Sequence, residues 1–473
     1  MQVMRFAHAA AVLAVVIAFT PSLTSRESDV VRHFTPRDQE VERYEYVPVS
    51  VPTGTTRLTF AYHYDAKGGA NAIDLGVFEP GPLALSSRAL RGWSGGSRDT
   101  VTIGIDDASP GYWPGPLPPG EWHVMLGLYK VAPEGVDVTV STTFSREPAG
   151  AIKPLPMRNA APLKRGPDWY AGVVHAHTTE SDGVLTASEL IEKARGERLD
   201  FIAITDHNNT THQRVALDRP DLLVITGEEV TTPNGHFNVW GLGGDRDYID
   251  FRIRAGDGAL ATLMEKAHRR GAVIGINHPV TDCLACTWTH DVPAAVAAIE
   301  IANGSLTARQ QSMAMWDTLL RAGRRITAVE GRDWHRGPDP IGAPVLRVRA
   351  DELSTPAVLD ALRRGRAIVM ANASMPPPDF TIATDDATFR VGDTVTIPRG
   401  TRLHVRVDVP PSLRTARVEW VWNGETLARW PIGSDGRVTD ERYAASSGYA
   451  RVHLVDTDGN LIAVTNPIFV IVR

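Results

Sequence analysis

Cysteine is almost absent from this chain. The 473 residues contain only Cys283 and Cys286, and these two form a single C-x-x-C pair. Because no second pair exists, a structural zinc site made of four cysteines is excluded within one chain. A thioredoxin-type role is also not indicated, because nothing places the pair at the start of a helix in a thioredoxin-like fold. Two interpretations of the cysteine pair remain open, namely a local disulfide and two free thiols.

Long apolar runs and excess positive charge are also missing. The one notable apolar run, Ala9 to Phe19, is shorter than the about 20 residues needed to span a bilayer. Arg5 precedes the run and small residues follow it at Ser22, Thr24 and Ser25. This pattern predicts a signal peptide over residues 1–25 and export to the periplasm or beyond, with an uncleaved anchor as the alternative. No other segment is expected to cross a membrane.

The charge balance and the motifs narrow the class of protein further. A net charge of −6 argues against a nucleic-acid partner, which usually binds a basic surface. The strand–turn–helix G-x-S-x-G elbow of serine esterases does not occur. A content of 43% hydrophobic and 22% charged residues is typical of a soluble folded chain, and this length predicts two or three domains.

The flanking regions have strand patterning. Residues 38–147 alternate apolar and polar side chains in RLTFAYHY and EWHVMLGLYKV, which predicts an N-terminal β-sandwich. Its Trp93, Trp113 and Trp122 could line a carbohydrate-binding face or pack in the core and turns. Residues 376–473 are again strand-like, with a hairpin at Asn423-Gly424, and predict a C-terminal immunoglobulin-like β-sandwich.

The middle region, residues 168–372, alternates short apolar strands with helical periods. The strands are GVVHAH, FIAIT, DLLVIT, FNVWGL, AVIGIN, AAIEI, RITAVEG, VLRVRA and AIVMA. Helices are expected at about 186–195, 258–270, 307–322 and 355–364, the first with Thr186 and Glu189 at capping-box spacing. This alternation predicts an α/β fold, most simply a β/α barrel.

Side chains that bind divalent metals gather in this middle region. They comprise six imidazoles and three carboxylates: His175, His177, Asp182, His207, Glu229, His236, His278, Asp333 and His335. Most of them end a predicted strand, and the carboxyl ends of barrel strands meet at one mouth. Zinc and manganese accept such nitrogen and oxygen donors, and so does iron. The sequence therefore predicts a multinuclear metal centre.

The motifs HAHTTESDG, TDHN, GEEV followed by GH, NHP and DWH resemble those of the PHP (polymerase and histidinol phosphatase) superfamily. The resemblance implies a distorted seven-stranded β/α barrel with two or three metal ions. The stretch GPLPPGEWHVMLGLYKV, the CLAC loop and the terminal TNPIFV are similar to the carbaryl hydrolase-like (CehA/McbA) branch of that superfamily.

The resemblance also implies a division of the ligands. His175, His177 and Asp333 would hold the first metal, Glu229 would bridge to a second with His236 and His278, and Asp182, His207 and His335 would hold a third. Many relatives have histidine where Asp182 stands. Glu228 is the alternative to Glu229, which better matches the Gly-x-Glu pattern. Asp206 is expected to orient an imidazole or to cap the following turn. His212, His268 and His290 match no motif, although His290 could face the substrate.

The predicted chemistry is hydrolysis of an ester-type bond in a small molecule. A hydroxide bridging two metals would attack phosphorus or a carbonyl carbon, with His175, His177, Glu229, Asp333 and His335 as the catalytic set. Phosphoesters are the expected broad class, and a carboxylic ester or aryl carbamate is the alternative. Arg332 and Arg336 could grip a phosphate, and Trp334 could wall a pocket. A non-catalytic exported binding protein is the outside alternative.

Overall fold

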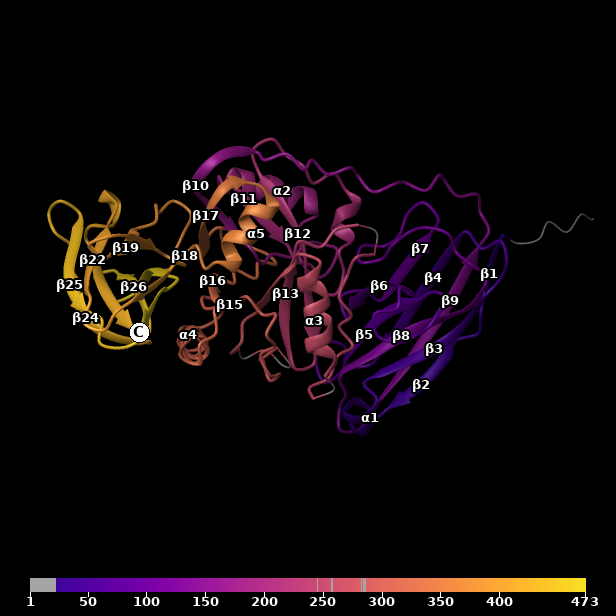
Figure 1. Ribbon diagram of the computed structural model, residues 1–473. Coiled ribbons are helices and arrows are strands. Elements are labelled where there is room, and N and C mark those ends of the chain that lie inside the picture. The colour runs from indigo at the N-terminus through magenta and orange to yellow at the C-terminus, as the bar shows by residue number, and fades with distance from the viewer. Residues whose placement is uncertain (1–22, 245, 257, 282, 284–285) are drawn as a thin grey trace, which may run out of the picture.

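The computed structural model describes residues 23–473 apart from 245, 257, 282, 284 and 285. Three units follow one another along the molecule, in the order of the chain (Figure 1). The predicted signal peptide lies almost entirely outside the described residues, so export stays a prediction. Among the described helices, none is long and apolar enough to cross a membrane.

The N-terminal unit consists of two antiparallel sheets. The first has the order β1 (Thr24–Arg26), β9 (Val136–Ser145), β4 (Arg57–Tyr64) and β7 (Thr100–Gly104), with β2 (Val30–Phe34) also on β9. The second has the order β3 (Tyr44–Val51), β8 (Gly120–Lys130), β5 (Ala72–Phe78) and β6 (Leu90–Gly95). A short helix, α1 (Pro36–Val41), connects β2 to β3. Buried side chains of both sheets form one core.

The second of these sheets is buried on both faces. Along β5, Ile73, Leu75 and Val77 belong to the core of the N-terminal unit. Phe78, together with Trp93 of β6 and Met125 of β8, belongs to the core of the central unit instead. Because side chains of a strand alternate between the two faces, one set packs inward and the other faces the central unit.

Seven strands of the central unit lie side by side in chain order. They are β10 (Lys164–Val173), β11 (Phe201–Ile204), β12 (Leu223–Thr232), β13 (Gly235–Trp240), β14 (Val273–Ile276), β15 (Ala298–Glu300) and β16 (Thr327–Val329). Neighbours pair in parallel except β13, which is antiparallel to both β12 and β14. An isolated parallel bridge from Ala176 to Trp334 joins the segments that follow β10 and β16. The two ends of the seven-strand run therefore meet at this point.

Four helices of the central unit lie where the sequence predicts them: α2 (Ala187–Gly196), α3 (Ala259–Arg269), α4 (Leu306–Arg321) and α5 (Thr355–Arg363). The capping box of α2 is present, since the Thr186 side chain accepts from the Glu189 amide and the Glu189 carboxylate accepts from the Thr186 amide. The prediction of a mixed α/β protein with many strands and few helices is confirmed. The closed seven-stranded barrel and the two sandwiches stay predictions.

The C-terminal unit shares a sheet with the central unit. Next to β10 lie β17 (Val345–Leu353) and β18 (Ala367–Met370), and β18 pairs with β27 (Leu461–Thr465). The sheet continues through β26 (Gly448–Val455), β23 (Arg417–Trp422) and β24 (Glu425–Pro431), with β28 (Ile468–Val472) and β21 (Thr394–Ile397) at its side. Strand hydrogen bonds thus cross the predicted boundary at residues 372–376.

The remaining strands form a separate four-stranded sheet, in the order β20 (Thr388–Arg390), β19 (Asp379–Ala383), β22 (Arg402–Asp408) and β25 (Arg437–Tyr443). Two short 3-10 helices, η1 (Thr211–Arg214) and η2 (Pro411–Leu413), lie in loops. The predicted hairpin is present, because β23 and β24 turn at Asn423 and Gly424, both with positive φ angles.

Candidate metal centre

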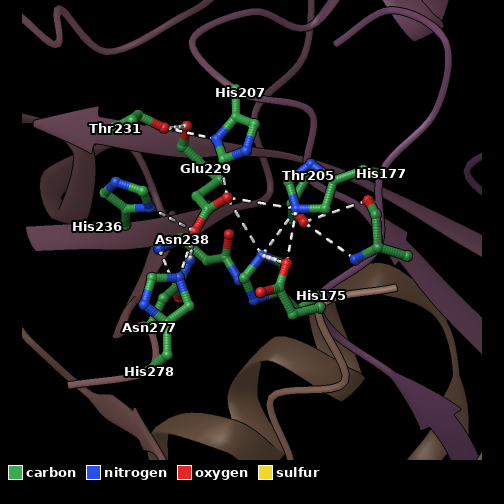
Figure 2. A network of polar contacts seen from close by, with 12 residues as sticks. His175, His177, Thr205, His207, Glu229, Thr231, His236, Asn238, Asn277 and His278 are labelled. Carbon is green, nitrogen blue, oxygen red and sulfur yellow. Dashed lines mark hydrogen bonds and ion pairs between the residues drawn. The ribbon is translucent and has the colours of Figure 1, made fainter. Parts of the chain in front are cut away.

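The structure gathers all nine predicted residues at one end of the central strands. His175 and His177 follow β10, His207 follows β11, His278 follows β14, and Asp333 and His335 follow β16. Glu229 lies within β12, His236 within β13, and Asp182 in the loop before α2. Figure 2 shows Glu229 between the surrounding imidazoles. Strands that end at one edge of a sheet bring residues far apart in sequence into contact.

Four donor atoms have the spacing of ligands around one ion. The Nε2 atoms of His175 and His177 are 3.0 Å apart, and each lies 3.3 Å from Glu229 Oε2 and 3.2 Å from Asp333 Oδ1. Donors about 2.0–2.2 Å from a shared zinc ion in tetrahedral geometry would lie about 3.3–3.6 Å apart. The observed distances are within a few tenths of an ångström of that arrangement.

Two further groups adjoin the first. His177, Asp182, His207 and His335 form one, and His207, Glu229 and His236 form the other. His278 Nε2 lies 3.0 Å and His236 Nδ1 lies 3.3 Å from Glu229 Oε1. Glu229 therefore directs one oxygen toward the first group and the other toward His236 and His278. The three groups share His177, His207 and Glu229. The division of the ligands that the resemblance implies stays a prediction.

Several donor atoms here are buried without a hydrogen-bond partner among the described residues. They are Glu229 Oε2, Asp333 Oδ1, His236 Nε2 and His278 Nδ1. Buried carboxylate oxygens and imidazole nitrogens are costly to leave unpaired. Zinc, manganese and iron bind oxygen and nitrogen donors of these kinds. The donor set is therefore compatible with two or three divalent ions.

Burial and neighbouring charges shift the pKa values of several ionisable groups in opposite directions. Burial alone would lower the pKa of His175, but the carboxylates of Glu229, Glu300 and Asp333 hold it well above the usual value. The pKa of Glu229 lies well below its usual range despite burial, because His175 and His207 favour its ionised form. His236 differs, since burial lowers its pKa to about 4. A neutral imidazole is the form that binds a metal.

The sequence did not indicate the residues that hold the ligands in place. Glu300, at the end of β15, has one oxygen 2.6 Å from His175 Nδ1 and the other 2.7 Å from the His278 amide nitrogen. The Asn277 side chain donates to Glu229 at 2.8 Å. A lone Glu or Asn in a short strand has no characteristic spacing, so only the three-dimensional contacts identify such residues.

The structure also places the residues for which the sequence left alternatives open. Glu228 accepts a hydrogen bond from the Ile249 amide, away from the cluster, and burial raises its pKa well above the usual value. Asp206 lies 3.1 Å from His212 Nδ1 and accepts from Ser181, whose hydroxyl lies 3.4 Å from His177 Nδ1. Asp206 thus pairs with an imidazole outside the nine, and Ser181 links it to His177.

The backbone at two of the nine residues is strained. His278 has a φ angle of 24° and Asp333 one of 50°, in the region that favours glycine. Such conformations cost roughly 1–3 kcal/mol each and persist where the surroundings impose them. Here the strain directs both side chains toward Glu229 and His175.

A cleft of about 500 Å³ opens over the cluster. Asp182, His207, Glu229, His236, His278, Asp333 and His335 line one side of it. Cys283 and Cys286, which form a disulfide in the structure, line another part. The opposite wall comes from the N-terminal unit and includes Asp74, Trp93 and Tyr129. No sequence pattern indicated that this unit reaches the centre.

The three predicted substrate-binding residues do not line the cleft. Arg332 donates to the Pro340 carbonyl, and Arg336 is exposed. The Trp334 indole is buried in a hydrophobic core and donates to the Asp339 carbonyl. Trp334 takes part in the centre through its backbone, which exchanges hydrogen bonds with His175 and His177.

Among the tryptophan and histidine side chains outside the cluster, some lie near the cleft and others do not. Trp113 and Trp122 are buried, as core and turn packing predicts, whereas Trp93 reaches the cleft. His268 is exposed on α3, and His290 is buried, with Nε2 3.0 Å from the Thr232 hydroxyl.

Comparisons with known proteins give partial similarities. No protein-family model matches the sequence. A segment of 115 residues, 21% of this chain, is 33% identical to the 5'-3' exoribonuclease Rnm of Salmonella typhimurium and spans 39% of that protein.

Two solved structures are also similar. One is a two-domain protein from Bacteroides vulgatus containing a predicted PHP-like metal-dependent phosphoesterase, 17% identical, with a TM-score of 0.36 over 68% of this chain and 100% of that one. The other is an amidohydrolase from Chromobacterium violaceum, 17% identical, with a TM-score of 0.27 over 36% of this chain and 89% of that one. Similarity at these scores assigns no activity to this chain.

Proposed function

We propose that this protein is a metal-dependent hydrolase of phosphoesters. The observation that carries the proposal is the group formed by His175, His177, Glu229 and Asp333, whose donor atoms have the mutual spacing of ligands around a common ion. Ions held there would lower the pKa of bound water to about 7 and stabilise developing negative charge as Lewis acids.

The chain's own residues supply the rest of the reaction site. Glu229 presents both oxygens to different imidazole groups, so its carboxylate would be shared by two neighbouring ions. Asp182, His207 and His335 form the most exposed group, beside the open cleft, where an oxygen of the substrate can approach. No serine or cysteine nucleophile is required, and the two thiols nearby are bonded to each other.

Phosphoesters are preferred over other esters because the matching segment of the Salmonella relative belongs to an exoribonuclease, an enzyme that cleaves phosphodiester bonds. The same centre would also attack a carboxylic ester or an aryl carbamate, the substrate class of the carbaryl hydrolase-like branch. We further propose that the protein is exported, on the basis of the apolar run from Ala9 to Phe19.

The test combines elemental analysis with turnover. The purified protein is assayed with p-nitrophenyl phosphate, bis-p-nitrophenyl phosphate and 1-naphthyl N-methylcarbamate, before and after chelation. We expect two or three metal ions per chain and chelator-sensitive hydrolysis of a phosphate ester. Faster turnover of the carbamate would replace the phosphoesterase assignment. If the protein has neither bound metal nor activity after reconstitution with zinc, manganese or iron, the alternative of a non-catalytic binding protein would be favoured.

Two adjacent glutamates provide a matched pair of variants. Glu229→Gln removes a carboxylate that contacts five imidazoles, so we expect loss of bound metal and of turnover in a folded protein. Glu228→Gln changes the neighbouring residue, whose pKa burial raises well above its usual value, and should retain both. Wild-type activity in the Glu229 variant would contradict the proposed centre.

A further inference from the structure

The four-stranded sheet of the N-terminal unit forms one wall of the cleft. None of the nine candidate metal ligands belongs to this sheet. Ala72 and Asp74 of β5, Trp93 of β6 and the following Ser94 to Ser97 line the cleft opposite the imidazoles. The Trp93 ring meets that of His207 edge-on, with centroids 6.4 Å apart. The wall therefore lies within reach of a substrate bound at the centre.

The sheet is built to place Asp74 in this wall. Asp74 stands opposite Gly127 of β8, and a Cβ at Gly127 would lie only 2.9 Å from the Asp74 Cβ. The missing side chain at Gly127 thus leaves the space that Asp74 occupies. Its neighbours in β5, Ile73 and Leu75, point to the other face and belong to the core of the N-terminal unit.

The Asp74 carboxylate has no hydrogen-bonded partner among the described residues. In the described part of the chain it forms neither a hydrogen bond nor a salt bridge, and no lysine or arginine lines the cleft. Arg43 interacts with Asp74 electrostatically and lines a small adjoining cavity, but it does not pair with it. Burial raises the pKa of Asp74 to about 7, although Arg43 and His207 favour its ionised form.

Aromatic side chains accompany this carboxylate. Trp93 and Tyr129 line the same cleft, and the Trp93 indole nitrogen is buried without a hydrogen-bond partner in the described structure. Gly95 has a φ angle of 53°, and a Cβ there would lie 2.7 Å from the Trp93 ring. An aromatic face beside an acidic group is the usual environment for a substituted ammonium ion.

The wall is fixed to the central unit. The Arg246 guanidinium lies 2.5 Å from a Glu79 oxygen, and the Arg252 side chain donates to the Tyr46 hydroxyl at 2.6 Å. On the opposite side, the Gly111 amide donates to Glu180 at 2.8 Å. Contacts on both sides of the cleft hold Asp74 and Trp93 at a set position relative to the imidazoles.

We propose that Asp74 and Trp93 form a subsite for a cationic group, so that the substrates are phosphodiesters with an ammonium-bearing alcohol. The inference rests on the proposed function, since it concerns the part of the substrate that points away from the reacting phosphorus. A quaternary ammonium group would place a positive charge beside the Asp74 carboxylate and would contact the ring of Trp93. The indole N–H would remain available to an ester oxygen.

The experiment compares two chromogenic diesters that differ only in charge. p-Nitrophenyl phosphorylcholine carries a quaternary nitrogen, and p-nitrophenyl 3,3-dimethylbutyl phosphate has carbon in its place. For the metal-loaded protein we expect kcat/KM to be about tenfold or more higher for the choline ester. In Asp74→Asn the preference should fall to less than about threefold. Asp65→Asn, an exposed carboxylate of the same unit, should keep the wild-type preference.

A binding measurement separates failure of this inference from failure of the proposed function. Calorimetric titration of the metal-loaded protein with phosphocholine and with 3,3-dimethylbutyl phosphate requires no turnover. Tighter binding of phosphocholine, lost in Asp74→Asn, supports the subsite even if no ester is hydrolysed. Equal affinities in the wild type, or a preference that survives in Asp74→Asn, would overturn it. Equally good hydrolysis of a glycerol diester would assign the wall to neutral hydroxyl groups instead.

Discussion

Glu300 offers the sharpest test of how the candidate metal centre is held. Its carboxylate is 1% exposed, and its two shortest hydrogen bonds are to the His175 imidazole at 2.6 Å and the His278 amide at 2.7 Å. The first contact fixes the proton of His175 on Nδ1, which leaves Nε2 free to face His177, Glu229 and Asp333. One carboxylate therefore sets both the tautomer of one ligand and the backbone position of another.

Glu300→Gln keeps the shape of this side chain but replaces one acceptor by a donor. If the amide oxygen accepts from the His278 amide, the NH₂ group faces His175 Nδ1 and favours the tautomer with its proton on Nε2. That tautomer cannot bind a metal at the first group. If the amide turns over, the NH₂ group opposes the His278 N–H and that hydrogen bond is lost. Either way we expect metal affinity to fall about 10- to 100-fold, or about 1.4–2.7 kcal/mol.

The assay is metal content after equilibrium dialysis against buffers of fixed free zinc or manganese. Glu228→Gln is the control, because this equally buried carboxylate accepts from the Ile249 amide and forms no hydrogen bond with the nine residues in the described structure. The melting temperature of each chelated variant shows whether the fold is retained. A folded Glu300→Gln protein with wild-type metal affinity would refute the tautomer argument. A loss of affinity in both variants would point to general damage to the core.

Two further predictions concern the junction with the C-terminal unit. Asp317 of α4 lies 2.9 Å from the buried Arg451 guanidinium and accepts from Tyr449, so Asp317→Asn should lower the free energy of unfolding by about 3–5 kcal/mol. Asp360→Asn, at an exposed ion pair, is the control and should lower the free energy of unfolding by about 1 kcal/mol or less in urea titrations. Equal losses of stability in the two variants would contradict the role of the buried Asp317–Arg451 pair. Burial and then Arg451 lower the pKa of His453 to about 3, so below pH 6.5 the unfolded chain takes up a proton that the folded chain does not. Stability should therefore fall by about 1.4 kcal/mol per pH unit from pH 6.5 toward pH 3. His453→Gln should reduce that slope, and an unchanged slope would exclude His453 as its source.

Much of the secondary structure followed from local patterns. Runs such as FIAIT and AVIGIN are too short and too apolar for surface helices, and they form β11 and β14. The start of α2 followed from Thr186 and Glu189, since a capping box depends only on residues three apart. The continuous sheet through β18 and β27 could not be predicted in this way, because the two strands are about 90 residues apart and their pairing has no local signature.

The residues of the candidate centre also differ in whether a local sequence pattern predicts them. Its nine residues could be proposed from the sequence because each stands in a short motif in or near a predicted strand. Glu300, Asp74 and Trp93 stand in no motif, and their importance comes from contacts with residues far away in the chain. The proposed grip of Arg332 and Arg336 on a phosphate came from nearness in sequence alone. Both side chains lie outside the cleft.

The loop that carries Asp182 depends on contacts made by the N-terminal unit. Arg98 donates to the Thr179 carbonyl at 2.5 Å, and the Gly111 amide donates to the Glu180 carboxylate. Asp182 follows two residues later and provides the only carboxylate of the most exposed metal group. The N-terminal unit thus supplies one wall of the cleft and also supports a ligand loop of the central unit. The candidate active site is therefore a property of both units together, and the central strands alone do not complete it.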